Sequence, residues 1–205
     1  MSPTAKWFHS SAGATHHTSL DDRSSPSAEQ DGELLRRLAH DEIEALDEAF
    51  ARFWAPIVSY LMGLLKSREA AEDIAQDAFC RLWERRALLR SDGSLRGFLY
   101  QVARNMAISE HRSENVRQRA LTALKMEPPT FAHIEIQYDG LSGELKRAIR
   151  SLPERRREIL ILHCIHGLTY KEVARLLGIA PQTVANQFSA ALDDLRRGLR
   201  VHAMV

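Results

Sequence analysis

The sequence predicts an all-α protein that consists of two small helical domains joined by a flexible linker. Apolar residues recur at the three- and four-residue spacing of amphipathic helices in two separate stretches of the 205-residue chain. Capping residues and glycines stand at the ends of several of these stretches of helical period. Between them the period is lost, and Pro128, Pro129 and Gly140 favour an irregular linker. No strand-rich region is visible.

These patterns divide the chain into four segments. Residues 1–30 are rich in Ser, Thr, Ala and His without any period, so we expect a disordered tail there. Residues 31–115 are expected to form the first helical domain, residues 116–142 the linker, and residues 143–202 the second helical domain. We expect the two domains to be tethered rather than fused.

The first domain begins with helices whose starts are marked in the sequence. The apolar period begins near Glu33, and a cap pattern from Asp41 to Glu44 introduces the next helix, which Pro56 is expected to interrupt or restart. Ser67 can cap a further helix. Its apolar side carries Ile74, Ala78, Phe79, Leu82 and Trp83. The opposite side is acidic and polar, a surface that repels DNA, and carries Glu72, Asp73, Gln76, Asp77 and Cys80.

A loop at residues 87–93 precedes a long helix that Ser94 can cap. Its inward side is expected to carry Leu95, Phe98, Leu99, Val102, Ala103 and Met106. Its exposed side is expected to carry Arg96, Tyr100, Gln101, Arg104, Asn105 and Arg112, and the alternative for Tyr100 is a place in the core. Cations can follow phosphates while rings and amides engage unstacked bases, so this mixture suits a single strand of nucleic acid.

The second domain has the spacing of a DNA-reading helix-turn-helix. Two S/T-x-x-E capping boxes are expected, at Ser151 and at Thr169. Ala174, Gly178 and Val184 follow the small residue, turn glycine and apolar plug of two helices that cross steeply. Residues 143–202 contain eleven Lys and Arg against six Asp and Glu, a net charge of +5 in a chain of net charge +1. Such an asymmetry favours a phosphate-binding face.

Several classes of protein and site are disfavoured. No apolar run is long enough for a membrane span and no secretory signal is visible, so a cytoplasmic location is expected. Cys80 and Cys164 suit two reduced thiols, and the crowded His163, Cys164 and His166 lack the distant second pair of a metal site. No catalytic motif appears. We therefore expect no enzyme activity, cofactor or small-molecule substrate.

The two domains together resemble an RNA polymerase sigma factor of the extracytoplasmic-function type. The stretch AAEDIAQDAFCRLW resembles the core-polymerase-binding helix of the second conserved region, and SLRGFLYQVARNMAISEHR resembles its promoter-melting helix. The stretch that begins SLPERRREILILHCIHGLTYKEVARLLG is similar to the fourth region. The resemblance implies three partners: core RNA polymerase, promoter DNA in duplex and melted form, and an anti-sigma factor.

The resemblance also implies roles for individual residues. Contacts to the clamp helices of the largest polymerase subunit are expected from Glu72, Asp73, Gln76, Asp77 and Arg81. Contacts to the minus-ten element, including a flipped non-template base, are expected from Arg96, Tyr100, Arg104, Asn105 and Arg112. Contacts to the bases of the minus-thirty-five element are expected from Gln182, Thr183, Asn186 and Gln187, and contacts to its phosphates from Lys171, Arg175, Arg196 and Arg197.

Three positions depart from the family pattern. Ala180 stands where a capping Ser or Thr is usual, so Pro181 has to help start the recognition helix. Gln187 replaces a commonly basic residue, and Ser109 replaces an acidic one. The alternative reading is a helix-turn-helix transcriptional regulator whose N-terminal unit senses a ligand or dimerises. Such a regulator should be a dimer, which a sigma factor need not be.

Overall fold

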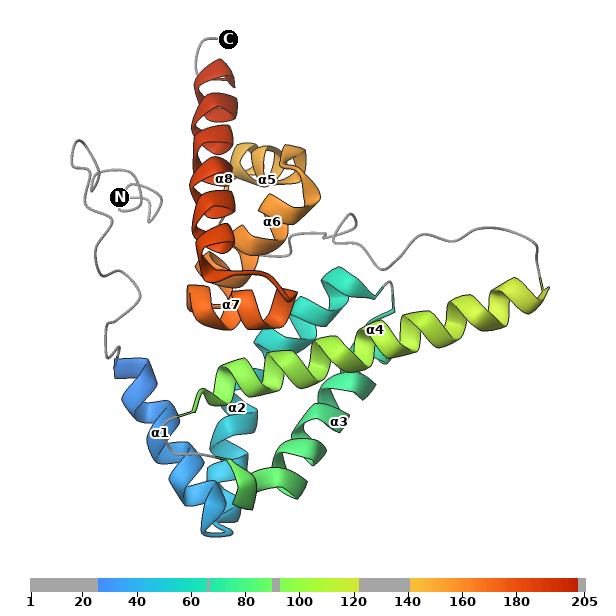
Figure 1. The fold of residues 1–205 in the computed structure, drawn as a ribbon, viewed down its shortest axis with the longest axis vertical. Helices are drawn as coiled ribbons and strands as arrows, with labels where there is room; N and C mark the ends of the chain where they lie inside the picture. Colours follow the sequence, from blue (N-terminus) through green and yellow to red (C-terminus); the bar gives the residue numbers. More distant parts are fainter. Residues whose placement is uncertain (1–25, 66, 90–92, 122–140, 203–205) are drawn as a thin grey trace.

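The computed structural model describes residues 26–65, 67–89, 93–121 and 141–202. Over these ranges the chain is helical and has no strand, as the sequence predicts (Figure 1). Four helices form the first domain and four form the second, with shorter helical turns between them. The tail up to residue 25 and the segment 122–140 lie outside the described residues.

The first domain is built from α1 (Pro26–Ala39), α2 (Ile43–Leu64), α3 (Arg68–Arg85) and α4 (Leu95–Leu121), with a 3-10 turn at Arg86–Leu88. Helices α2, α3 and α4 pack on one another, and α1 lies against α2 and α4. Their buried faces follow the apolar spacing of the sequence. Residues at the centre of this core include Phe53, Ile57, Leu61, Ala78, Leu82, Leu99 and Ala103.

The second domain contains α5 (Gly143–Ser151), α6 (Glu154–Leu160), a π-helical turn (Ile161–Ile165), α7 (Tyr170–Leu177) and α8 (Pro181–His202). Helices α5, α6 and α7 all pack against α8. Gly178 ends α7 in the left-handed region, with φ 65°, where a residue without a Cβ avoids steric strain. Ala174 and Val184 are buried on either side of this turn. The helix-turn-helix spacing is thereby confirmed.

Three of the expected helix starts are confirmed. The Ser67 Oγ accepts a hydrogen bond from the Ala70 N–H at 3.2 Å, and the Ser94 Oγ accepts one from the Gly97 N–H at 2.9 Å. Thr169 forms the full capping box, in which its side chain accepts from the Glu172 N–H and the Glu172 carboxylate accepts from the Thr169 N–H. Each cap satisfies a backbone donor that the helix leaves unpaired.

Two expected caps are wrong. Ser151 ends α5, and its hydroxyl donates to the carbonyl of Ala148 at 2.8 Å. Helix α6 instead follows Pro153, which has no side-chain acceptor to offer. At the start of α2 the N-cap is Glu42, which makes no side-chain cap hydrogen bond. Asp41, at φ 63°, pairs with Arg86 across the domain instead of capping.

Pro56 does not interrupt α2. The helix runs through it from Ile43 to Leu64 as one element. Proline removes one backbone donor, but Phe53 and Ile57 on either side are buried, at 2% and 0% exposure. We infer that the burial of this face outweighs the lost hydrogen bond. Helix α4 also continues past residue 115 to Leu121.

The two domains pack against each other. Figure 1 shows α7 lying against the N-terminal half of α4, and contacts join these two helices. The expectation of two domains that are tethered without being fused therefore describes the covalent chain but misses a direct contact. The side chains of this contact form the centre of the candidate functional site.

Candidate functional site

Tyr100 of α4 and His166 of the second domain meet at the centre of the contact. The Tyr100 Oη and the His166 Nδ1 are hydrogen-bonded at 2.8 Å, and the two residues are 1% and 6% exposed. The ring of Tyr60, from α2, lies 5.2 Å from the Tyr100 ring and meets the His166 ring edge-on at 5.7 Å. Because buried polar groups need partners, this bond satisfies a donor and an acceptor that come from different domains.

A buried ion pair lies beside the three rings. Glu158 of α6 is 4% exposed, and its Oε1 lies 2.7 Å from the Arg104 Nη1 of α4. Its Oε2 lies 3.1 Å from the Arg155 Nη1. The Arg104 Nη1 also donates to the Tyr60 hydroxyl at 3.0 Å. Since an unpaired buried charge is costly, Glu158 is stabilised by one cation from each domain.

The start of α4 makes a third contact with the second domain. The Arg96 Nη1 donates to the Gly167 carbonyl oxygen at 2.7 Å. Gly97 approaches α7 closely, since a Cβ added to it would lie 3.1 Å from the Glu172 Oε1 and 3.2 Å from the Glu172 Cγ. Arg96, Tyr100 and Arg104 are spaced by four residues, so they form one stripe along α4. The second domain covers this stripe.

Burial shifts the pKa values of the covered groups. Burial, with a smaller effect of the nearby Arg96 charge, lowers the pKa of His166 to about 3, so this ring is neutral at physiological pH. Burial raises the pKa of Glu158, although Arg104 and Arg155 oppose the shift. Burial also raises the pKa of the Tyr60 phenol. The contact is thus built for a neutral imidazole beside neutral phenols.

The residues expected to contact the minus-ten element fall into two groups. Tyr100 takes the core alternative, since it is buried between Tyr60 and His166. The expectation that Arg104 lies on an exposed side is wrong, because the second domain covers the stripe that it shares with the half-buried Arg96. Asn105 and Arg112 are exposed on α4, and the Gln101 Nε2 donates to the Asn105 Oδ1 at 3.1 Å. Only this second group presents its side chains to solvent.

The polar face of α3 is open to solvent. Asp73, Gln76, Asp77 and Arg81 are exposed, while the half-buried Glu72 pairs with Arg68 at 2.7 Å. The structure brings these five expected polymerase contacts together on one helix face. Helices α3 and α2 pack side by side, so a surface of α2 adjoins this face.

That adjoining surface is aromatic, which the sequence reasoning missed. Phe50 falls in the apolar period of α2 but is 42% exposed. It stacks on Trp54 with ring centroids 4.6 Å apart and lies 5.0 Å from the Phe79 ring. The helical period places Phe50 with the apolar residues, and nothing in the sequence shows that the core ends before reaching it. The acidic face of α3 is therefore bordered by an exposed aromatic ring.

The N-terminal part of α8 is the expected recognition helix. Pro181 is its first residue, in keeping with the expected role of this proline. Gln182, Thr183 and Asn186 are exposed, and the Gln182 Nε2 donates to the Asn186 Oδ1 at 3.0 Å. Gln187 is half-buried, and its Oε1 accepts from the Arg156 Nε at 3.4 Å. Three of the four expected base-contacting residues thus face solvent.

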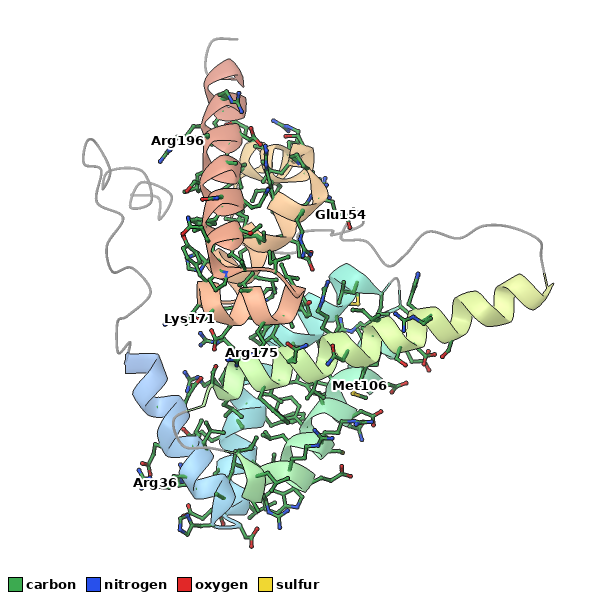
Figure 2. The ribbon with its side chains drawn as sticks, in the orientation of Figure 1. Arg36, Met106, Glu154, Lys171, Arg175 and Arg196 are labelled. Carbon is green, nitrogen blue, oxygen red and sulfur yellow. The ribbon has the colours of Figure 1, made fainter. Side chains whose placement is uncertain are left out.

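The four cations expected at phosphates are all exposed but do not form one cluster. Lys171 and Arg175 lie on α7, whereas Figure 2 shows Arg196 far along α8 from both. Arg196 donates to Asp193 at 2.9 Å, and Arg197 pairs with Asp194. The carboxylates reduce the positive charge at the far end of α8, so α7 and the start of α8 form the more cationic edge.

The crowded histidines and cysteine serve packing. The His163 Nδ1 hydrogen-bonds the Leu168 carbonyl oxygen at 2.7 Å, and its ring contacts those of Tyr170 and Phe188. Burial raises the pKa of Cys164 to about 11. In the described part of the chain, no group of three His, Cys, Asp or Glu side chains could hold a metal ion. None of the helices described has the length and apolar character needed to cross a membrane.

Comparison with known proteins identifies both domains. Residues 49–117 match the family model described as Sigma-70 region 2, and residues 142–195 match the model described as Sigma-70, region 4. The chain is 31% identical over 150 residues to the probable RNA polymerase sigma factor RfaY of Xanthomonas campestris pv. campestris. This match covers 70% of this chain and 37% of that protein. It is 29% identical over 170 residues to the ECF RNA polymerase sigma factor RpoE of Cereibacter sphaeroides, which covers 80% of this chain and 92% of that protein.

A solved structure has a similar fold. The sigma factor RpoE of Bartonella quintana, in a co-crystal with the anti-sigma factor NepR, superposes with a TM-score of 0.56 at 23% identity. The match covers 76% of this chain and 96% of that one. It therefore spans both domains.

Proposed function

The chain belongs to the sigma-70 family of RNA polymerase sigma factors, to its extracytoplasmic-function type, and from this premise we propose how its surfaces divide the work of transcription initiation. The observation that carries the proposal is that region 2 and region 4 occur in this order in one chain, at residues 49–117 and 142–195. Sigma factors are regulatory proteins, and we propose no catalytic residue. The working units are the two domains expected at residues 31–115 and 143–202, of which the first extends in the structure from Pro26 to Leu121, into the expected tail 1–30 and into the expected linker 116–142.

Core RNA polymerase binds the open face of α3. Asp73, Gln76 and Asp77 are exposed there with Arg81, and Glu72 borders them. A carboxylate face is a poor DNA ligand but can pair with basic side chains of a protein partner. The exposed Phe50 beside it adds the kind of aromatic anchor that often dominates binding free energy at protein interfaces.

The minus-ten element binds α4. The exposed Asn105 and Arg112 supply an amide and a cation, and the stripe of Arg96, Tyr100 and Arg104 supplies two cations and a ring. Extruding a base from the duplex costs a few kcal/mol, which stacking and hydrogen bonds to that base have to offset. The stripe can contribute only when the second domain no longer covers it.

The minus-thirty-five element binds the start of α8. Gln182 and Asn186 can pair with adenine N6 and N7 in the major groove, and Thr183 and Gln187 flank them. Lys171 and Arg175 fix the register through phosphates, and Arg196 and Arg197 extend the contact along α8. Since one chain carries both DNA-binding domains, the second contact is intramolecular and two weak sites act as a strong one.

A cytoplasmic location and an anti-sigma partner complete the proposal. The polymerase and its DNA are cytoplasmic, and the Bartonella quintana sigma factor of similar fold was crystallised with an anti-sigma factor. The alternative of a helix-turn-helix regulator with a sensing domain leaves the region 2 match at residues 49–117 without a role.

Transcription in vitro tests the proposal. The purified chain is mixed with core RNA polymerase that lacks any sigma subunit and with a pool of genomic promoter fragments, and the transcript starts are sequenced. Specific starts that share two spaced upstream elements are expected. Binding to duplex DNA without any specific start would favour the regulator instead.

A further inference from the structure

We propose that Arg156 sets the base preference of the recognition helix by fixing the amide of Gln187, so that Gln187 donates hydrogen bonds to a guanine of the minus-thirty-five element. Arg156 lies on α6, and Gln187 lies near the start of α8. The inference rests on the proposed function of α8 and adds to it the base that one residue reads. Arg156 is a positioning residue, because it acts on the base only through Gln187.

A carboxylate of α8 holds Arg156 in place. The Arg156 Nη1 donates to the Asp194 Oδ2 at 2.6 Å, and the Arg156 Nε donates to the Gln187 Oε1 at 3.4 Å. The hydrogen bond from Arg156 is the main reason that the pKa of Asp194 lies below its ordinary value, so this carboxylate is charged at physiological pH. One edge of the guanidinium is thereby fixed, and its Nε is directed at Gln187.

The chemistry of the guanidinium decides which end of the Gln187 amide faces it. A guanidinium has only donors, so the atom of Gln187 that meets Arg156 has to be the carbonyl oxygen. The NH2 group at the other end of the amide therefore points away from Arg156. The bond between the Gln182 and Asn186 amides, at 3.0 Å, carries no such constraint, because each of those amides has both donors and an acceptor.

Gln187 borders the exposed face of the recognition helix. It is half-buried, it follows the exposed Asn186, and it lies one helical turn after the exposed Thr183. Its oxygen is engaged on the side of α6, so the NH2 group is the part of its amide that remains for the major groove. Asp194 offsets the charge of Arg156, so this cation is better suited to orienting Gln187 than to binding a phosphate.

An NH2 group distinguishes bases by the acceptors that they present. In the major groove guanine presents two acceptors, N7 and O6, whereas adenine presents the N7 acceptor beside the N6 donor. A glutamine that uses both ends of its amide matches adenine, but one that offers only its NH2 group matches guanine and sets donor against donor at adenine N6. Thymine presents one acceptor beside its methyl group. The bond from Arg156 thus predicts guanine opposite Gln187.

Duplex binding by the full chain tests this preference. Each position of the minus-thirty-five element found in the transcription assay is changed in turn to every other base pair. At one position the unaltered chain should prefer G·C to A·T at least about fivefold. Arg156→Met removes the donors but keeps an unbranched side chain, and it should move this ratio at least about fivefold toward A·T. Arg150→Met removes the same charge from the exposed side of α5 and should leave every preference unaltered.

Two further variants separate positioning from a general effect on structure. Gln187→Ala should abolish the preference at the same position, and Arg156→Met added to Gln187→Ala should not change it again. Asp194→Ala leaves both Arg156 and Gln187 in place but removes the carboxylate that holds the guanidinium, so it should shift the ratio in the same direction as Arg156→Met. It also tests the proposal if circular dichroism shows that Arg156→Met has lost helix content.

Three results would overturn the proposal. If Gln187→Ala alters no position, Gln187 does not read a base. If the unaltered chain prefers A·T at the position that Gln187→Ala abolishes, Arg156 does not restrict the amide. If folded Arg156→Met and Asp194→Ala both keep the G·C preference, the bond from Arg156 does not set it. Failure of the proposed function looks different, because the unaltered chain would then select no base pair at any position and give no specific transcript start.

Discussion

The Tyr100 hydroxyl and the His166 ring nitrogen, 66 residues apart in the sequence, meet at 2.8 Å and join the two domains. Tyr100 lies on α4, the helix proposed to bind the minus-ten element, and His166 lies beside the helix-turn-helix. Their hydrogen bond links the state of one DNA-binding surface to the position of the other domain.

Replacing Tyr100 by Phe should favour separation of the two domains without unfolding the first domain. The ring remains to pack against Tyr60, but the His166 nitrogen loses its partner, which costs about 1 to 3 kcal/mol for a buried group. That corresponds to roughly a 5- to 150-fold rise in the ratio of chains with separated domains to chains with packed domains. Energy transfer between dyes on Cys80 and on a cysteine at the exposed Ser189 should fall.

A control variant and a check of helix content test whether the change is specific to Tyr100. The variant Ser151→Ala is a control, since the Ser151 hydroxyl donates to the Ala148 carbonyl within α5 and its loss should leave the energy transfer unchanged. Circular dichroism should show the same helix content in both variants. Unchanged energy transfer in Tyr100→Phe would mean that the hydrogen bond does not hold the domains together.

Acidification should weaken the contact between the two domains by protonating His166. The pKa of His166 is about 3 while the two domains are packed together and near 6.5 once the ring is exposed. The contribution of the neutral ring to the domain contact is therefore complete above pH 6.5 and declines as the pH falls toward 3. By linkage the loss at pH 5 is about 2 kcal/mol. The raised pKa values of Glu158 and Asp31 favour the packed domains at low pH, because those carboxyls take up protons more readily while they are buried.

The variant His166→Asn separates these effects. Its amide oxygen can replace the ring nitrogen as a partner for Tyr100 but does not titrate near neutral pH. Energy transfer should fall between pH 7 and pH 5 in the unaltered chain and change much less in the variant. The same fall in both chains would assign the pH response to groups other than His166.

Local chemistry was the part of the fold that the sequence could predict. The Thr169 capping box, the Gly178 turn and the Ser67 cap each depend on residues within four positions of one another, and all three are present. The expected capping box at Ser151 is absent because Ser151 is the last residue of α5, and the next helix, α6, begins only after Pro153. Local rules do not weigh such alternatives against the packing around them.

The domain contact lay beyond sequence reasoning for a physical reason. The stripe of Arg96, Tyr100 and Arg104 is polar enough to face solvent, DNA or another domain, and helical spacing fixes only that these residues share a side. Glu158 gives no signal of burial in its run of charged residues, because its partner Arg104 lies 54 positions earlier. Which face of α4 meets the second domain emerges only from the tertiary structure.

The α3 face should control polymerase binding. Changing the exposed Asp77 to Lys reverses a charge at the centre of this face, and we expect recovery of core polymerase in a pull-down to fall at least tenfold, a loss of about 1.4 kcal/mol. Glu144→Lys makes the same charge change on the exposed side of α5 and should leave recovery unaltered. Equal recovery in both variants would exclude Asp77 from the interface.

Asn186 and Lys171 should differ in the way they contribute to binding of the minus-thirty-five element. The exposed Asn186, oriented by Gln182 at 3.0 Å, is proposed to read a base, so Asn186→Ala should cost about 1 to 3 kcal/mol on the preferred sequence and little on an altered one. Lys171 is proposed to contact a phosphate, so Lys171→Ala should weaken binding to both sequences alike. It should also reduce the slope of log affinity against log salt by about 0.9. Duplex binding by the full chain, titrated at several salt concentrations, measures both quantities, and a sequence-independent loss for Asn186→Ala would make that residue a backbone contact instead.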